Sequence, residues 1–194
     1  MSSVQERIIG IHSQRKTLKL PVEPLSLLRI KAQEMGRLDR QYCGQYPIDV
    51  RAYVLDTDVL VAAFRSGAGA SRQVLAAARA HRFELLLSVP LMLEYESVLT
   101  RPENLAASGA SREDVSAVLD ELAAIGKRVE LVIRTRPMLL DPNDEMVLET
   151  AINGGADAIL TLNERDIRQA ATPFRCSVVW PGEAVRRLAK EEKE

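Results

Sequence analysis

Histidine, cysteine and aromatic side chains are scarce in this chain of 194 residues, and each shortage argues against a class of function. The two histidines, His12 and His81, are too few for a His-based zinc site or a Ser–His–Asp triad to be expected. The two cysteines, Cys43 and Cys176, form no metal-binding motif and are interpreted as free thiols. Aromatic residues make up 4% of the chain, which argues against recognition of single strands by base stacking.

Long hydrophobic runs are also missing. No apolar run approaches the length of a membrane span, and the N-terminus lacks the hydrophobic segment of a signal peptide. The expected compartment is therefore the cytoplasm, without a membrane partner. Hydrophobic residues are 46% and charged residues 27% of the chain, which is the composition of a soluble globular protein.

The net charge of −1 is small but unevenly distributed. Residues 1–50 hold eight Lys/Arg and five Asp/Glu, a balance of +3, whereas residues 51–194 hold eighteen and twenty-two, a balance of −4. Nucleic-acid-binding modules are usually basic, so the acidic larger part argues against a passive binding module. It argues less against a nuclease in which metal ions contact the phosphates.

Residues 51–194 alternate strand-like and helix-like segments. This alternation predicts an α/β fold with a parallel sheet and helices on both of its faces. Ligands of such sheets bind beyond the carboxyl ends of the strands, at a topological switch point. The predicted strands are Ala52–Leu55, Phe83–Leu87, Val129–Ile133, Ala158–Leu162 and Ser177–Trp180.

Polar capping residues mark the helices between these strands. A last helix is expected from Pro181 into the charged tail, and Trp180 is expected in the core. The other predicted helices, with their caps, are Arg72–Ala80 (Ser71), Leu91–Leu99 (Ser88, Pro90), Val115–Gly126 (Ser111, Asp114) and Asn143–Asn153 (Asp141, Pro142). Glu145 and Glu149 are expected to face solvent. Three arginines, Arg101, Arg165 and Arg168, could contact RNA phosphates, but a solvent-exposed position is the favoured interpretation for isolated arginines.

Residues 1–50 follow a different pattern and are predicted to be an extension and linker outside the main domain, 51–194. Residues 16–36 resemble the strand and first helix of a ribbon-helix-helix DNA-binding antitoxin, without the second helix of that motif. Residues 37–50 have no clear periodicity and contain Gly44 and Pro47, as linkers do. A disordered extension and a translation start placed too early are the open alternatives.

Four carboxylates lie beside apolar runs, near the ends of predicted strands or helices: Asp56, Glu94, Asp144 and Asp166. A like-charge cluster at the rim of a core is unfavourable unless a cation neutralises it. Carboxylates without histidine or thiol favour Mg²⁺ or Mn²⁺. Such an ion activates water and stabilises the charge of a phosphoryl transition state, so the pattern predicts a metal-dependent hydrolase.

These carboxylates lie in the segments VLDTDVLVAA, SVPLMLEYESVLTRP and DPNDEMVLETAINGGADAILTLNERDI. In order and spacing, the segments resemble the motifs of the PIN-domain family, in particular the VapC-like toxin ribonucleases of bacterial toxin–antitoxin systems. The resemblance covers roughly residues 51–187. It implies a three-layer α/β/α sandwich around a mainly parallel five-stranded sheet. It also places Asp56, Glu94, Asp144 and Asp166 on the catalytic, metal-binding positions.

The resemblance further implies an endoribonuclease dependent on Mg²⁺ or Mn²⁺, which hydrolyses RNA with metal-activated water. Relatives are typically neutralised by a cognate antitoxin protein, and they often form homodimers. This chain departs from the family at Asp58, where the family has Asn, and at Asn163, where many relatives have Asp. Asp58 could be a further metal ligand, could orient the other ligands, or could cap the next helix. Thr161 and Asn163 could orient a ligand or a phosphate, or could form an ordinary loop hydrogen bond.

Two other interpretations are open. Asp56-Thr57-Asp58 also resembles the Asp-x-Asp motif of haloacid-dehalogenase-type phosphatases, in which Asp56 would be the nucleophile and Asp58 an acid/base. That family needs a downstream lysine, and the lysines that follow the motif are Lys127, Lys190 and Lys193. The other interpretation is a catalytically inactive PIN domain that binds RNA or a protein.

Overall fold

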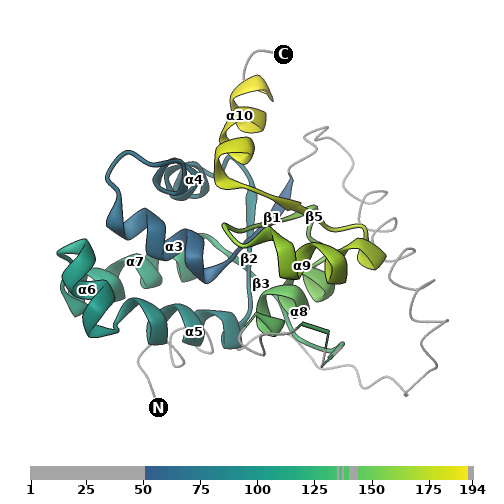
Figure 1. The fold of residues 1–194 in the computed structure, drawn as a ribbon, viewed down its shortest axis with the longest axis horizontal. Helices are drawn as coiled ribbons and strands as arrows, with labels where there is room; N and C mark the ends of the chain where they lie inside the picture. The colour runs from purple at the N-terminus through teal and green to yellow at the C-terminus, as the bar shows by residue number, and fades with distance from the viewer. Residues whose placement is uncertain (1–50, 135, 137, 140–143, 192–194) are drawn as a thin grey trace. The chain divides into compact units, whose positions relative to one another are not determined.

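The central sheet has five parallel strands in the order β3-β2-β1-β4-β5 (Figure 1). The structure is a computed structural model. It describes residues 51–134, 136, 138–139 and 144–191, apart from the side chains of Asp166 and Glu191. The interpretations of residues 1–50 and of Asp141 as a helix cap lie outside the described residues.

The two central strands consist entirely of buried residues. The strands are β1 (Ala52–Leu55), β2 (Glu84–Leu87), β3 (Lys127–Arg128), β4 (Ala158–Leu160) and β5 (Ser177–Val179). Every residue of β1 and of β4 is buried, as expected for strands covered on both faces. Tyr53 in β1 is paired with Leu85 on one side and with Ala158 on the other. The predicted parallel sheet is therefore confirmed.

The strand order creates a switch point at the centre of the sheet. The chain enters at β1, continues to β2 and β3 on one side, and then returns to β4 and β5 on the other side. Connections from β1 and β4 therefore diverge at the carboxyl edge of the sheet. A crevice for ligands is expected there, beyond Leu55 and Leu160.

Helices cover both faces of the sheet, so the fold is the expected three-layer α/β/α sandwich. On one side are α3, α4, α5, α6 and α7, and on the other are α8 and α9 (Figure 1). Their bounds are α3 Thr57–Arg65, α4 Ala70–Arg79, α5 Val89–Leu99, α6 Pro102–Ser108, α7 Arg112–Ile125, α8 Glu145–Gly154 and α9 Glu164–Ala171, with a 3₁₀ turn at Thr172–Phe174 and a last helix α10 at Pro181–Glu191. Within the described residues, no helix is long and apolar enough to cross a membrane.

Two of the four predicted N-terminal capping signals are present in the structure. Ser88 accepts a hydrogen bond from the Leu91 amide at 3.4 Å, and Ser111 with Asp114 forms the capping box of α7. Gly155 closes α8 with φ 65°, a left-handed conformation that glycine adopts without strain. The prediction for Ser71 is wrong, because α4 begins one residue earlier, at Ala70, with Gly69 as its N-cap.

The prediction of the third strand is wrong in position. The strand comprises only Lys127–Arg128, and Val129 adds one further bond from its amide to the Leu87 carbonyl at 2.7 Å. After that, the amides of Val132 and Ile133 donate to the side-chain oxygen of Asn153, at 2.9 and 2.7 Å. Residues 129–133 therefore have the composition of a strand, but the amides of Val132 and Ile133 bond to the side chain of Asn153 in α8 and not to a neighbouring strand.

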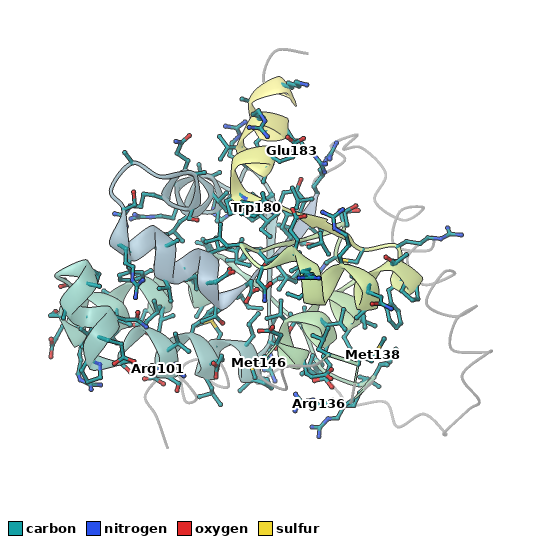
Figure 2. All side chains as sticks on the ribbon, in the orientation of Figure 1. Arg101, Arg136, Met138, Met146, Trp180 and Glu183 are labelled. Carbon is teal, nitrogen blue, oxygen red and sulfur yellow. The ribbon has the colours of Figure 1, made fainter. Side chains whose placement is uncertain are left out.

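Two predictions of burial are also wrong. Trp180, expected in the core, is 51% exposed at the start of α10 (Figure 2). Glu145 and Glu149, expected in solvent, are 2% and 1% exposed. The two glutamates are buried because the segment before α8 folds back over this helix and provides their hydrogen-bond donors.

Candidate active site at the carboxyl edge of the sheet

Asp56 occupies the crevice position directly after β1. Its backbone is extended, with φ −72° and ψ 153°, and its amide donates to the Leu160 carbonyl of β4 at 2.8 Å. The residue is 5% exposed. Although Asp56 precedes α3, its side chain makes no cap hydrogen bond to that helix.

The end of β4 holds both aspartates of the first motif. The Thr161 hydroxyl donates to Asp56 Oδ2 at 2.6 Å, and the Leu162 amide donates to Asp58 Oδ2 at 2.9 Å. The Asn163 amide in turn donates to the Thr161 hydroxyl oxygen at 2.9 Å. Because Thr161 is fully buried, this chain of bonds fixes the two carboxylates relative to the switch point.

Asp56, Glu94 and Asp144 line one open pocket of about 720 Å³. Glu94 comes from α5, and Asp144 is the residue before α8. Three of the four predicted metal ligands thus share a pocket with Asp58 and Asn163, two of the three residues predicted to orient them. The fourth predicted ligand, Asp166, belongs to α9, and its side chain lies outside the described part of the chain.

The two aspartates of the first motif resist ionisation. Burial, followed by the charge of Asp58, raises the pKa of Asp56 from 3.8 to about 6, against the lowering effect of the Thr161 hydroxyl. Burial also raises the pKa of Asp58, and the charge of Asp144 adds to this shift. Asp58 Oδ1 is buried without a hydrogen-bond partner among the described residues. A buried carboxylate oxygen without a partner is unfavourable unless a cation or water contacts it.

Tyr95 lies beneath the carboxylates and was not predicted from the sequence. It is fully buried, and its hydroxyl donates to the Leu55 carbonyl, the last residue of β1. Burial, and then the charges of Asp56 and Asp58, raise the pKa of Tyr95 well above its usual value, so the phenol stays neutral. The residue following Glu94 in α5 thus supports the end of β1 from below.

The segment before α8 is held by acidic and amide side chains on one face of that helix. Glu145 accepts from the amides of Met138 and Leu139, at 2.6 and 2.9 Å. Glu149 accepts two bonds from the Arg136 guanidinium, at 3.0 and 2.9 Å. Arg136 and Met138 lie beside α8 (Figure 2). These bonds anchor the chain on both sides of Asp144 and so help to place it at the pocket.

The donor set suits a hard divalent cation. All the acidic groups of the pocket offer oxygen, and neither histidine nor cysteine is among its lining residues in the described chain. In that part of the chain, no three His, Cys, Asp or Glu side chains are close enough to enclose a metal ion. Mg²⁺ does not need such an enclosure, because it keeps several waters and is often held by one or two carboxylates. A buried Asp56 beside an unpaired Asp58 oxygen therefore fits a hydrated Mg²⁺ or Mn²⁺.

Comparison with known proteins agrees with the motifs. Residues 52–165 match the sequence profile of the PIN domain, which is more than half of the chain. The chain belongs to the PIN-domain family. No curated protein matches this PIN domain. A structure of VapBC2 from Rickettsia felis bound to a DNA fragment from its promoter is similar to it, with 13% identity and a TM-score of 0.48, over 66% of this chain and 98% of that chain.

Because the chain belongs to the PIN-domain family, its fold does not support the interpretation as a haloacid-dehalogenase-type phosphatase. A lysine, which that phosphatase chemistry needs, is also missing from the described lining of the pocket. Of the three lysines after the motif, Lys127 forms an exposed ion pair with Glu84 at 3.0 Å. Asp56-Thr57-Asp58 in this PIN domain is therefore better explained as the family's first motif, with Asp58 in place of Asn.

Proposed function

We propose that this PIN domain is an endoribonuclease dependent on Mg²⁺ or Mn²⁺ and the toxin component of a toxin–antitoxin system. The observation that carries the nuclease proposal is the pocket at the switch point of the sheet. Asp56, Glu94 and Asp144 line this pocket, together with Asp58, of which one buried oxygen has no hydrogen-bond partner among the described residues. PIN domains are generally nucleases, and they typically use divalent metals.

In this proposal, the acidic residues bind the metal and the residues around them position the acids. Asp56, Glu94, Asp144 and Asp166 would hold the metal. When bound, the metal lowers the pKa of water and neutralises charge on a phosphodiester. Thr161 orients Asp56 through its hydroxyl, and the Leu162 amide orients Asp58. Tyr95 supports the end of β1 and excludes water from beneath the carboxylates.

The pocket also accommodates a polymer better than a small phosphomonoester. It is open to solvent, and its volume of about 720 Å³ extends well beyond the carboxylates, along α3 and α5. An open groove lets a strand enter and leave on both sides of the bond that is cut. The choice of RNA over DNA, and the toxin role, rest on the resemblance of the motifs to VapC-like ribonucleases.

Cleavage of total cellular RNA by the purified full chain tests the nuclease proposal. We expect cleavage with Mg²⁺ or Mn²⁺, none in excess EDTA, and none by the Asp56→Asn variant with either metal. Cleavage that survives both EDTA and Asp56→Asn would point to a contaminating nuclease or another site. Mg²⁺ binding by calorimetry without any cleavage would favour an inactive PIN domain that binds RNA or protein.

The toxin proposal has its own test. Induction of the wild-type chain in a bacterial host should arrest growth, and Asp56→Asn should not. Co-expression of a small protein encoded directly beside this gene should restore growth by forming a complex that masks the pocket. Growth unaffected by an active wild-type chain would leave a nuclease that is not a toxin.

A further inference from the structure

The pocket does not end at the carboxylates. From Asp58 it follows α3 to Arg65, and from Glu94 it follows α5 and the next turn to Arg101. In both cases, the arginine lies seven positions after the acid. Within α3, seven positions are about two turns of helix, or roughly 10 Å along its axis, and return to nearly the same face. Arg101 lies beyond Leu99, the last residue of α5, where the backbone is extended with φ −62° and ψ 138°. Since α3 packs against α5 and α6, the pocket has an acidic end and a cationic end.

The guanidinium of Arg65 is held in place by a neutral group. Its Nη2 donates to Asn104 Oδ1 at 2.7 Å, while Asn104 Nδ2 donates to the Val98 carbonyl at 2.8 Å. The second bond fixes the orientation of the amide, so its oxygen must face Arg65. One donor of the guanidinium is used, and no other partner is recorded for it among the described residues. Arg65 is thus pre-positioned with donors available at the pocket.

Three other arginines of the domain are neutralised by carboxylates, unlike the pair at the pocket. Arg79 is paired with Glu121 at 2.7 Å, Arg168 with Glu164, and Arg186 with Glu183. By contrast, no salt bridge is recorded for Arg65 or Arg101 within the described chain, and that end of the pocket is lined by Ser66, Val98 and Asn104.

Arg101 is exposed, as predicted from the sequence, but it also lines the pocket. It lies where α5 passes into α6 (Figure 2). Its backbone is fixed, because its carbonyl accepts from the amides of Asn104 and Leu105 at 3.0 Å each. The side chain therefore extends from a firm position, beside the end of α5 that follows Glu94.

We propose that Arg65 and Arg101 form a phosphate-binding subsite for the nucleic-acid strand, which grips a backbone phosphate next to the one at the carboxylates. The inference rests on the proposed nuclease function. A strand suits both ends of the pocket, since one phosphate meets the cation-neutralised carboxylates and a neighbouring phosphate meets the arginines. Guanidinium groups also match phosphate oxygens bidentately.

Binding, measured separately from cleavage, tests this subsite. A fluorescein-labelled single-stranded oligoribonucleotide is titrated with the full-length Asp56→Asn protein in Mg²⁺, and Kd is followed by anisotropy at several salt concentrations. Adding Arg65→Gln or Arg101→Gln should raise Kd about three- to tenfold. It should also lower the slope of log Kd against log salt by about 0.7 for each arginine. Arg65→Lys, which keeps the charge, should recover part of the affinity.

Arg72→Gln is the matched control. Arg72 is an exposed arginine of α4 that does not line the pocket, and its loss should leave Kd and the salt slope unchanged. A second arm uses oligonucleotides with one neutral methylphosphonate linkage at successive positions. The parent protein should lose affinity at one linkage beside the cleavage site. The Arg65→Gln/Arg101→Gln double variant should show no further loss there, because that phosphate is no longer contacted.

The outcomes separate this inference from the nuclease proposal. Absence of RNA cleavage by the wild-type chain rejects the proposed function, whereas the ratio of Kd values still decides the subsite. Equal Kd values and salt slopes for the parent and both glutamine variants, with unchanged melting curves, overturn the subsite. Binding of poly-glutamate but not of the oligoribonucleotide, with the same dependence on the two arginines, also overturns it in favour of an acidic protein ligand.

Discussion

Thr161 donates its hydroxyl proton to Asp56 across 2.6 Å, a bond between residues 105 positions apart in the chain. The bond connects the carboxyl ends of β1 and β4, the two strands on either side of the switch point. It stabilises the ionised form of Asp56, against the burial that disfavours that form. The hydrogen bond therefore favours an ionised Asp56, which could bind a cation, at the carboxyl edge of the sheet.

Thr161→Val should show how much this bond contributes. Valine keeps the shape of threonine but leaves Asp56 without its hydroxyl donor and the Asn163 amide without its acceptor. We expect a loss of about 1–3 kcal/mol in the free energy of unfolding at pH 8, measured by urea denaturation. RNA cleavage should fall, and its dependence on pH should shift upward because the pKa of Asp56 rises. Thr161→Ser, which keeps the hydroxyl, is the control and should lie near the wild type in both measurements.

Asp56→Asn should stabilise the metal-free protein in a way that depends on pH. The folded pKa of Asp56 is about 6, above its unfolded value near 3.8. The stability associated with this group is therefore fully present below about pH 4 and is lost as the pH rises through 6. In EDTA, the variant should match the wild type near pH 4 and exceed it by about 1–3 kcal/mol at pH 8.

Thermal unfolding from pH 4 to pH 8 checks this prediction, and Glu130→Gln, a change of an exposed side chain, is a control for the loss of one carboxylate. Added Mg²⁺ should raise the melting temperature of the wild type and have little effect on Asp56→Asn. A variant that is less stable than the wild type at pH 8 in EDTA would mean that Asp56 is a structural residue.

The sequence was sufficient to predict the parallel sheet, because that prediction depends only on local composition. β1 and β4 are short apolar runs in the sequence and fully buried strands in the structure. An element that has no buried residues has no apolar pattern in the sequence from which it could be predicted. Helix α6 has no fully buried residue, and its seven residues were not predicted as a helix. The third strand was misplaced because the side chain of Asn153, not a strand, bonds to the β-branched run.

The site was predictable in its residue types but not in its bonding. Asp56 and Glu94 could be named because they lie beside apolar runs, and Asp144 because its motif matches the spacing of the PIN-domain family. The bonds that orient these acids, such as the one from Thr161 to Asp56 across 105 positions, depend on strand order. The same holds for Arg65 and Asn104, which are 39 positions apart. The seven-residue spacing from acid to arginine was the one signal in the sequence that could have suggested the cationic end.

Deletion of residues 1–50 should leave a folded nuclease domain. The strands described in the structure all lie beyond residue 51, and the core formed by the described residues begins at Ala52. We expect a chain of residues 51–194 to be soluble, to unfold cooperatively by circular dichroism, and to cleave RNA at a rate similar to that of the full chain. Deletion of residues 1–55, which also removes β1, should abolish folding. Insoluble protein from the shorter deletion would show that the first 50 residues belong to the domain.

Glu94→Gln should abolish RNA cleavage while the domain stays folded. Glu94 is partly exposed at the pocket, so the loss of its charge should cost little stability, but it removes one carboxylate from a metal site that has few. Mn²⁺ binds such ligands more tightly than Mg²⁺ and should partly restore cleavage. Glu96→Gln is the matched control, because Glu96 lies two residues further along α5 and lines a separate pocket of about 330 Å³. Cleavage rates in Mg²⁺ and in Mn²⁺ decide the outcome.

Full activity of Glu94→Gln in Mg²⁺, combined with covalent phosphorylation of Asp56 by a small phosphomonoester, would contradict the nuclease assignment. The protein would then be a phosphatase that uses Asp56 as its nucleophile.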